Sequence, residues 1–113
     1  MYQIKIAKDF SRTPGGRHKR LGPASGEEFR DVLVQTLKMH PNENIEIIFD
    51  GAEGYGSSFL EEAFGGLVRL NLFPDNIIRD RLILTANSPD FETYVSETKQ
   101  YIRDAISRKS IRR

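Results

Sequence analysis

Two adjacent serines, Ser57 and Ser58, are the side chains of this sequence best placed to do chemistry. They follow a glycine-rich stretch and open a segment with helical spacing of apolar residues, so their hydroxyls and the free amides of the first helical turn would face the same space. Such a helix start favours anions, including phosphate. The predicted partner-docking set is Tyr55, Gly56, Ser57, Ser58, Phe59, Glu61 and Glu62.

A purely local role explains the same serines. Ser58 and Glu61 have the spacing of a capping box, which stabilises a helix by about 1 kcal/mol without any regulatory meaning. Gly65 and Gly66 lie inside the same predicted helix, where each costs about 1 kcal/mol relative to alanine. That cost indicates a close backbone approach, either to a partner or to the protein's own sheet.

A second candidate site is a basic loop that contains two glycines. Glycine amides beside guanidinium groups can cradle a phosphate of a nucleotide or of a nucleic-acid backbone. The loop lacks the ending of a P-loop and the interleaved aromatics of single-strand binders, so a solvated loop or a protein-docking arm is the alternative. The candidate residues are Arg12, Gly15, Gly16, Arg17, Lys19 and Arg20.

Composition argues against several other kinds of site. The chain contains no cysteine, which excludes disulfides and thiolate zinc sites, and its two histidines, His18 and His40, lie in separate segments. Asp9, Asp50 and Glu53 could approach one another and hold magnesium, but no base, nucleophile and orienting group form a recognisable set. We therefore expect a non-enzymatic protein without a metal or a cofactor.

Charge is unevenly distributed along a chain whose formal net charge is +1. Residues 12–20 carry four positive side chains and no acid, and residues 103–113 carry five positive side chains against one aspartate. The rest of the chain holds eight basic and 15 acidic side chains. This polarity suits oriented docking on a charged partner, or simple solvation of two basic segments.

The elements that must position these residues begin with a strand. Residues 2–7 alternate apolar and polar side chains, as a half-exposed strand near a sheet edge does. Residues 11–24 contain several glycines and prolines and predict a long loop. Ser25 and Glu28 fit a capping box, and apolar residues at helical spacing continue to His40, where the helix ends.

The same alternation continues to the end of the chain. Residues 45–49 are apolar and β-branched, as expected of a central parallel strand covered on both faces. Residues 57–72 predict a deeply buried helix, residues 82–84 a second buried strand, and Ser88-Pro89-Asp90 the start of a final helix. This order predicts an α/β fold with a small mixed, mostly parallel sheet and about three packed helices.

A chain of 113 residues can bury one modest core. We therefore expect one domain over residues 1–113, with a long basic loop at 11–24 and a basic tail at 107–113. The first residues lack the layout of a signal peptide, and no apolar run is long enough to span a bilayer. The expected location is cytoplasmic.

The stretch that follows the predicted strand at 45–49 resembles the STAS domains of anti-sigma-factor antagonists. In those domains a strand that ends in aspartate leads to a Ser-Ser pair at a helix start, followed by glycine and leucine. A narrower resemblance is to a bacterial STAS-like family that lacks an assigned activity. It rests on Lys8–Arg12, Pro14-Gly15, Ser25–Arg30 and Tyr55–Leu67. Both resemblances imply a STAS-like α/β fold.

The resemblance also implies a role for the serine pair. In the antagonists, a histidine-kinase-like ATPase phosphorylates the second serine, and phosphorylation blocks docking. That position is Ser58 here, with Ser57 as the neighbouring candidate. Two features depart from the pattern: Gly56 stands where aspartate is usual, and Glu61 and Glu62 would repel an added phosphate.

Two functional hypotheses follow. The first is a regulatory protein-interaction module that docks on a partner, such as a kinase-like ATPase, through the Gly56-Ser57-Ser58 helix start and is switched by serine phosphorylation. The alternative is an accessory protein that binds nucleic acid or a nucleotide through residues 12–20, with an affinity that falls steeply with salt. We expect no membrane association, and the sequence leaves the oligomeric state open.

Overall fold

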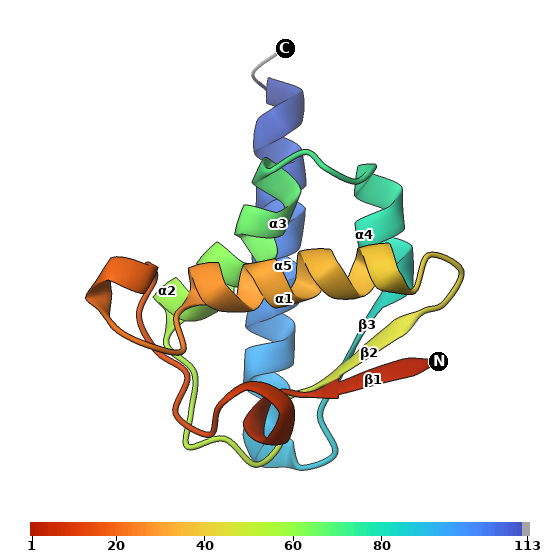
Figure 1. Cartoon of the computed structure of the whole chain (residues 1–113). Helices are drawn as coiled ribbons and strands as arrows, with labels where there is room; N and C mark the ends of the chain where they lie inside the picture. The colour runs from red at the N-terminus through yellow and green to blue at the C-terminus, as the bar shows by residue number, and fades with distance from the viewer. Residues whose placement is uncertain (112–113) are drawn as a thin grey trace.

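Strands and helices alternate along the chain (Figure 1). The computed structural model describes the backbone of residues 1–111 and the side chains of residues 1–109. The strands are β1 (Tyr2–Lys5), β2 (Ile45–Ile48) and β3 (Leu82–Thr85). The α-helices are α1 (Gly26–Met39), α2 (Ser57–Leu60), α3 (Gly66–Arg69), α4 (Asp75–Arg81) and α5 (Pro89–Ile111). Shorter turns are the π-helical η1 (Ile6–Phe10) and η3 (Glu61–Gly65) and the 3-10 helical η2 (Lys19–Leu21).

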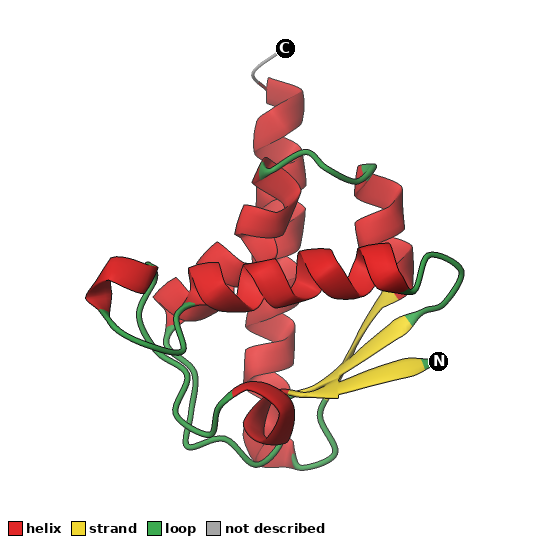
Figure 2. Ribbon diagram, viewed as in Figure 1, coloured by secondary structure: helices red, strands yellow, loops and turns green. Residues whose placement is uncertain are grey.

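The sheet is parallel throughout, with the strand order β1-β2-β3 (Figure 2). Parallel neighbours need a crossover connection, and helices supply it. α1 lies between β1 and β2 in the chain, and the helices within residues 57–81 lie between β2 and β3. The predicted α/β class and the central position of β2 are confirmed, whereas the predicted mixed sheet is parallel in all of its described strands.

The two faces of the sheet differ in burial. Ile4, Ile47 and Leu82 point toward the helical layer and are at most 5% exposed. On the opposite face Glu46 is half-buried and Ile83 is exposed. On this face of the central strand, however, Ile48 is only 9% exposed, so the predicted cover of both faces holds fully for the helical face and in part for the other.

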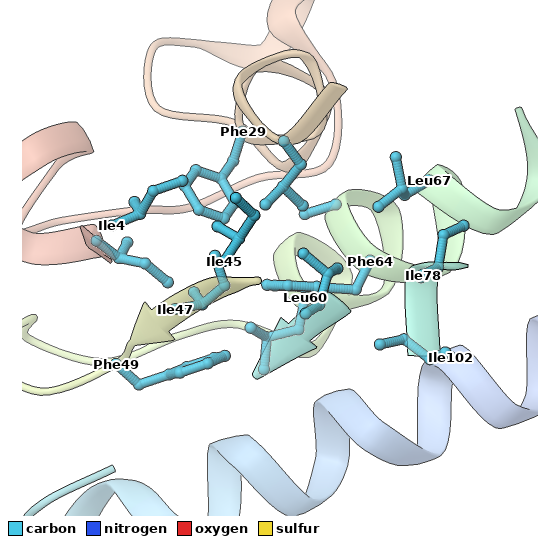
Figure 3. Packing of buried hydrophobic residues seen from close by; sticks show 14 of the residues in the cluster. Ile4, Phe29, Ile45, Ile47, Phe49, Leu60, Phe64, Leu67, Ile78 and Ile102 are labelled. Atoms are coloured by element: carbon cyan, nitrogen blue, oxygen red, sulfur yellow. The ribbon is translucent and has the colours of Figure 1, made fainter. Parts of the chain in front are cut away.

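The hydrophobic core lies between the sheet and the helices (Figure 3). The ring centroid of Phe64 lies 6.0 Å from that of Phe49, which follows β2, and 5.9 Å from that of Phe29 on α1. All three side chains are fully buried. Because protein interiors are close-packed, this aromatic cluster fixes α1 and the helix that carries Phe64 relative to the sheet.

α2, η3 and α3 form one continuous helical segment over residues 57–69. The backbone stays right-handed helical at Leu60 and Gly66, where the three parts join. In the π-helical middle, the Gly66 amide donates to the Glu61 carbonyl five residues earlier. The segment ends short of the predicted Leu72, because Asn71 adopts a φ of 57°. A left-handed residue of this kind commonly ends a helix.

The edges of the sheet differ from the sequence prediction. β1 ends at Lys5 and not at residue 7, because the chain turns into η1 and the Asp9 carboxylate accepts the Lys5 amide proton at 2.8 Å. β3 is an edge strand, with Ile83 38% exposed, and not a buried strand. α4 has no counterpart among the predicted elements, since seven residues are too few for a clear helical period.

The predicted starts of the first and the last helix are confirmed. The Ser25 hydroxyl accepts from the Glu28 amide at 3.1 Å, and α5 begins at Pro89. Within the predicted basic tail at 107–113, α5 continues as far as Ile111, and residues 112–113 lie outside the described residues. Among residues 1–111, no helix has the length and apolar character needed to cross a membrane.

Candidate functional site

The helix start at residues 56–58 lies just beyond the carboxyl end of β2. Gly56 is the N-cap residue, with extended φ and ψ of −74° and 149°. Gly56, Ser57 and Ser58 are all exposed. Binding sites in α/β folds form at the carboxyl ends of parallel strands, so the position of this serine pair suits recognition. We call Gly56, Ser57 and Ser58 the serine edge.

The capping-box explanation of Ser58 is wrong. The helix begins at Ser57, so Ser58 already lies inside its first turn, and no side chain caps the segment. The Leu60 amide donates to the Gly56 carbonyl at 3.2 Å, as an ordinary helix requires. Within the described residues, the amides of the first three helical residues have no acceptor. The serine edge therefore combines free amides with hydroxyls that no cap occupies.

The two serines have different neighbours. Burial and then Glu97 raise the pKa of the Tyr101 phenol on α5, and the nearby Ser57 side chain opposes this rise. Ser57 therefore faces α5. Ser58 makes no side-chain hydrogen bond among the described residues. Of the two hydroxyls, that of Ser58 is the freer one.

The loop before the serine edge is held at three points. The Tyr55 phenol donates to the Phe49 carbonyl at 2.6 Å, and burial raises the pKa of this phenol well above its usual value. The Asp50 carboxylate accepts from the Asn87 and Ser88 amides at 2.9 and 2.8 Å. These bonds tie the end of β2 to the connection between β3 and α5, so the loop is anchored on both sides.

The structure corrects the predicted docking set. Tyr55 is 7% exposed, Phe59 is fully buried and Glu62 is 8% exposed. Their side chains pack against or bind other parts of this chain, and a partner cannot contact them without unfolding the segment. The accessible part of the predicted set is the serine edge and the half-buried Glu61.

A network of ion pairs lies one helical turn beyond the serine edge. Arg17 Nη1 donates to Glu61 Oε1 at 2.6 Å and to Glu62 Oε1 at 2.9 Å. Arg30 Nη1 donates to Glu62 Oε2 at 2.7 Å, and Arg69 pairs with Glu61. The hydrogen bonds from Arg69 and then from Arg17 hold the pKa of Glu61 below its usual value. We call these five side chains the arginine–glutamate network.

The arginine–glutamate network explains Gly65 and Gly66. A Cβ on Gly65 would lie 2.6 Å from Glu61 Oε2, and a Cβ on Gly66 would lie 3.2 Å from Arg30 Cδ. The two glycines leave room for the network, so the close approach predicted from the sequence is to charged side chains of this chain and not to the sheet.

The basic loop is folded against the body of the protein. Arg17 belongs to the arginine–glutamate network, and Lys19 Nζ donates to Asp31 Oδ2 at 2.6 Å. The Gly15 amide donates to the Ala24 carbonyl, and the Gly16 carbonyl accepts from the Gly26 amide. Arg17, Lys19 and the Gly15 amide, which were predicted to bind phosphate, are therefore occupied, whereas at Gly16 the bond uses the carbonyl and not the amide.

Two cations of the basic loop face solvent. Arg12 and Arg20 are exposed, and neither side chain forms an ion pair within the described part of the chain. The Arg12 carbonyl accepts from the Glu53 amide at 2.8 Å, so the basic loop runs beside the loop that precedes the serine edge. Figure 1 shows the two loops together at the same side of the molecule.

The other residues considered for metal binding make ordinary contacts. Asp9 and Asp50 accept from backbone amides, and Glu53 is exposed. His40 Nδ1 lies 2.9 Å from Glu43 Oε2, and His18 Nδ1 lies 3.7 Å from Glu27 Oε1. Within residues 1–111, no three histidine, aspartate or glutamate side chains gather closely enough to hold a metal ion.

Sequence reasoning missed the arginine–glutamate network because its partners are far apart in the chain. Arg17 and Glu61 are separated by 44 residues. The only local signal is Glu61 and Arg69, which are separated by eight residues and lie on one face of the helix. Pairing Arg17 with this face requires the tertiary fold.

Comparison with known protein families returned a match over residues 25–92, more than half of the chain. The matching family is described as STAS-like domain of unknown function (DUF4325). The matched segment begins at the Ser25 cap and includes the serine edge and all of β2 and β3. Neither a search of curated proteins nor a search of solved structures returned a match.

Proposed function

We propose that this chain, which belongs to the family of STAS-like domains of unknown function, is a non-enzymatic regulatory module that docks on a partner protein through the serine edge. The observation that carries the proposal is the exposure of Ser57 and Ser58 beside free helix amides at the carboxyl end of the central strand. If Ser57 and Ser58 were buried, a partner could not dock at the serine edge.

The Ser58 hydroxyl is the proposed phosphorylation site, and a kinase-like ATPase is the proposed kind of partner. A phosphate at the first helical turn is favoured by the free amides and the helix dipole. The repulsion expected from Glu61 and Glu62 is reduced, because arginines of the arginine–glutamate network neutralise both carboxylates. The ion pairs with arginine therefore offset the negative charges of Glu61 and Glu62, which the sequence alone predicts to oppose phosphorylation.

The arginine–glutamate network gives phosphorylation a route to the basic loop. Side chains three and four residues apart on a helix are neighbours, so a phosphate on Ser58 lies beside Glu61 and Glu62. Both carboxylates hold Arg17, which belongs to the basic loop. A phosphate dianion competes for this guanidinium and changes how residues 11–24 sit beside the serine edge.

The proposal is tested by affinity capture from a lysate of the source organism on three baits: the wild type, Ser58→Asp and Ser107→Asp. Ser107 is an exposed serine on α5 and provides a matched charge change away from the serine edge. We expect a protein that binds the wild type and Ser107→Asp and is lost with Ser58→Asp. Equal binding to all three baits refutes docking at this edge.

The switch is tested separately with the captured protein and ATP. Intact mass measurement should show the mass of one phosphate added to the wild type and not to Ser58→Ala. If the captured protein binds but adds no phosphate, the docking proposal stands and the proposed phosphorylation switch is refuted. Phosphate added equally to Ser58→Ala places the modification elsewhere in the chain.

A further inference from the structure

We propose that the outer edge of β3 is a second docking surface, which binds an extended acidic and apolar segment of a partner protein as a fourth strand. Figure 1 shows β3 and α4 on the side of the molecule opposite α2, so this surface is separate from the serine edge. The proposal does not depend on Ser57 or Ser58.

Backbone groups along β3 are open to a further strand. The Phe49 amide donates to the Thr85 carbonyl, which fixes which residues of β3 face β2. In a parallel ladder alternate residues face the neighbouring strand, so Ile83 and Thr85 pair with β2, while Leu82 and Leu84 direct their backbone groups outward. The Leu82 amide donates a hydrogen bond to the Ile78 carbonyl at the end of α4. Among the described residues, the Leu84 amide and the Leu82 and Leu84 carbonyls have no partner.

The opposite edge of the sheet is partly closed by its own chain. The Tyr2 amide donates to Asn44 in the strand pair, so the Gln3 and Lys5 amides face outward on β1. The Asp9 carboxylate accepts the Lys5 amide proton. Natural sheets commonly block edge amides in such ways. On β3 the Ile78 carbonyl likewise accepts from the Leu82 amide, so among the described residues each edge keeps one open amide, Gln3 on β1 and Leu84 on β3.

An apolar pocket of about 260 Å³ lies beside the open edge. Its apolar lining consists of Ile78 from α4, Leu82 and Leu84 from β3 and Ile102 from α5. Alternate residues of an added strand point to the same face, so one of them would enter this pocket. Drug-sized ligands occupy pockets of about 300–1,000 Å³, so this volume fits one or two side chains better than a whole small molecule.

Three cations surround the pocket and fix the charge of its occupant. Arg79, Lys99 and Arg103 line it and are exposed. Within the described residues none of the three forms an ion pair, and Arg103 donates only to the Gln100 side chain. Like charges gathered without a counterion repel one another, and an acidic segment relieves this repulsion.

Charge also argues against a second copy of the chain as the occupant. Two copies that paired through their β3 edges would bring both sets of Arg79, Lys99 and Arg103 together. The resulting like-charge contact is unfavourable. An extended segment that alternates acidic and apolar residues suits this surface best. Its backbone can pair with the free groups of β3, its apolar side chains can fill the pocket, and its acidic side chains can pair with the cations.

The test is a selection of short random peptides against the immobilised full chain, followed by affinity measurement of the enriched sequences. We expect enriched peptides to alternate acidic and apolar residues. Their binding should weaken about tenfold or more in Lys99→Glu/Arg103→Glu, because two attractive contacts become repulsive. The matched control, Arg12→Glu/Arg20→Glu, makes the same change of charge at two exposed arginines on the basic loop and should bind normally.

Amide hydrogen exchange measured by NMR locates the bound peptide. Binding should protect the Leu84 amide and leave the Gln3 amide unchanged, since only the β3 edge gains a strand. Equal loss of affinity in the two double variants, or no protection of Leu84, refutes the proposal. Dodecanoate tests whether the pocket binds a small amphipathic anion instead. The proposal is also refuted if no peptide is enriched and dodecanoate binds in a way that depends on Lys99 and Arg103.

Discussion

Three glycines lie where the chain crosses itself around the arginine–glutamate network. Gly65 and Gly66 leave space for charged side chains of that network, whereas Gly26 leaves space for backbone. A Cβ on Gly26 would lie 2.5 Å from the Phe59 carbonyl oxygen and 3.0 Å from Glu62 Cβ. The first residue of α1 therefore sits directly on the helix that carries the serine edge.

Gly26→Ala is expected to lower the free energy of unfolding by roughly 1–3 kcal/mol, because a carbonyl oxygen cannot move aside and α1 must shift. Urea unfolding followed by circular dichroism measures the change. Gly15→Ala is the control, since nothing lies within 4 Å of its added Cβ and its φ is not positive. Equal effects in both variants would show that the contact with Phe59 is unimportant.

Helix α1 joins the basic loop to the core, and its start depends on one side chain. Ser25 is fully buried, and its hydroxyl accepts from the Glu28 amide at 3.1 Å. Just before it, Gly15 and Ala24 pair through their backbones and close the basic loop on itself. Local capping and loop closure therefore act together at the entrance to α1.

Ser25→Ala is expected to lower the free energy of unfolding by about 1 kcal/mol, because the Glu28 amide loses its acceptor. The measured change should be a lower urea midpoint at an unchanged denaturant slope. Ser96→Ala serves as the control, because Ser96 is an exposed serine within α5, where alanine is the better helix former. A midpoint that is unaffected by Ser25→Ala would contradict a stabilising cap.

At the scale of the whole molecule, the arginine–glutamate network joins the basic loop, α1 and the helix at residues 57–69. Arg17, Arg30 and Arg69 come from these three segments and converge on two adjacent carboxylates. The stability of this junction depends on the charge of Glu61. Its pKa is lowered in the folded protein, chiefly by the hydrogen bond from Arg69 and then by the bond from Arg17.

The free energy of unfolding is therefore expected to fall as the pH drops from about 5 to about 3. A glutamate of the unfolded chain has a pKa of about 4.3, so it takes up a proton before the folded carboxylate does, and the contribution of Glu61 is lost as the pH passes through its lower folded pKa. Thermal unfolding across this range should show a shallower decline in Glu61→Gln than in the wild type. Glu53→Gln removes an exposed carboxylate as the control, and identical profiles for Glu61→Gln and the wild type would contradict a role for this ion pair.

The sequence by itself determined the α/β class, the parallel central strand, predicted at residues 45–49, the Ser25 cap and the exposed helix start at Gly56-Ser57-Ser58. Each of these follows from local spacing, strand hydrophobicity or capping chemistry, which act over a few residues.

Only the tertiary structure decided which charges pair, which strand edge stays open and which members of the docking set are buried. Arg17 reaches Glu61 and Glu62 across more than 40 residues. Phe59 is buried because it packs against Phe10, Phe29 and Tyr55. Contacts of this kind depend on how whole elements pack, and no local pattern in the sequence encodes them.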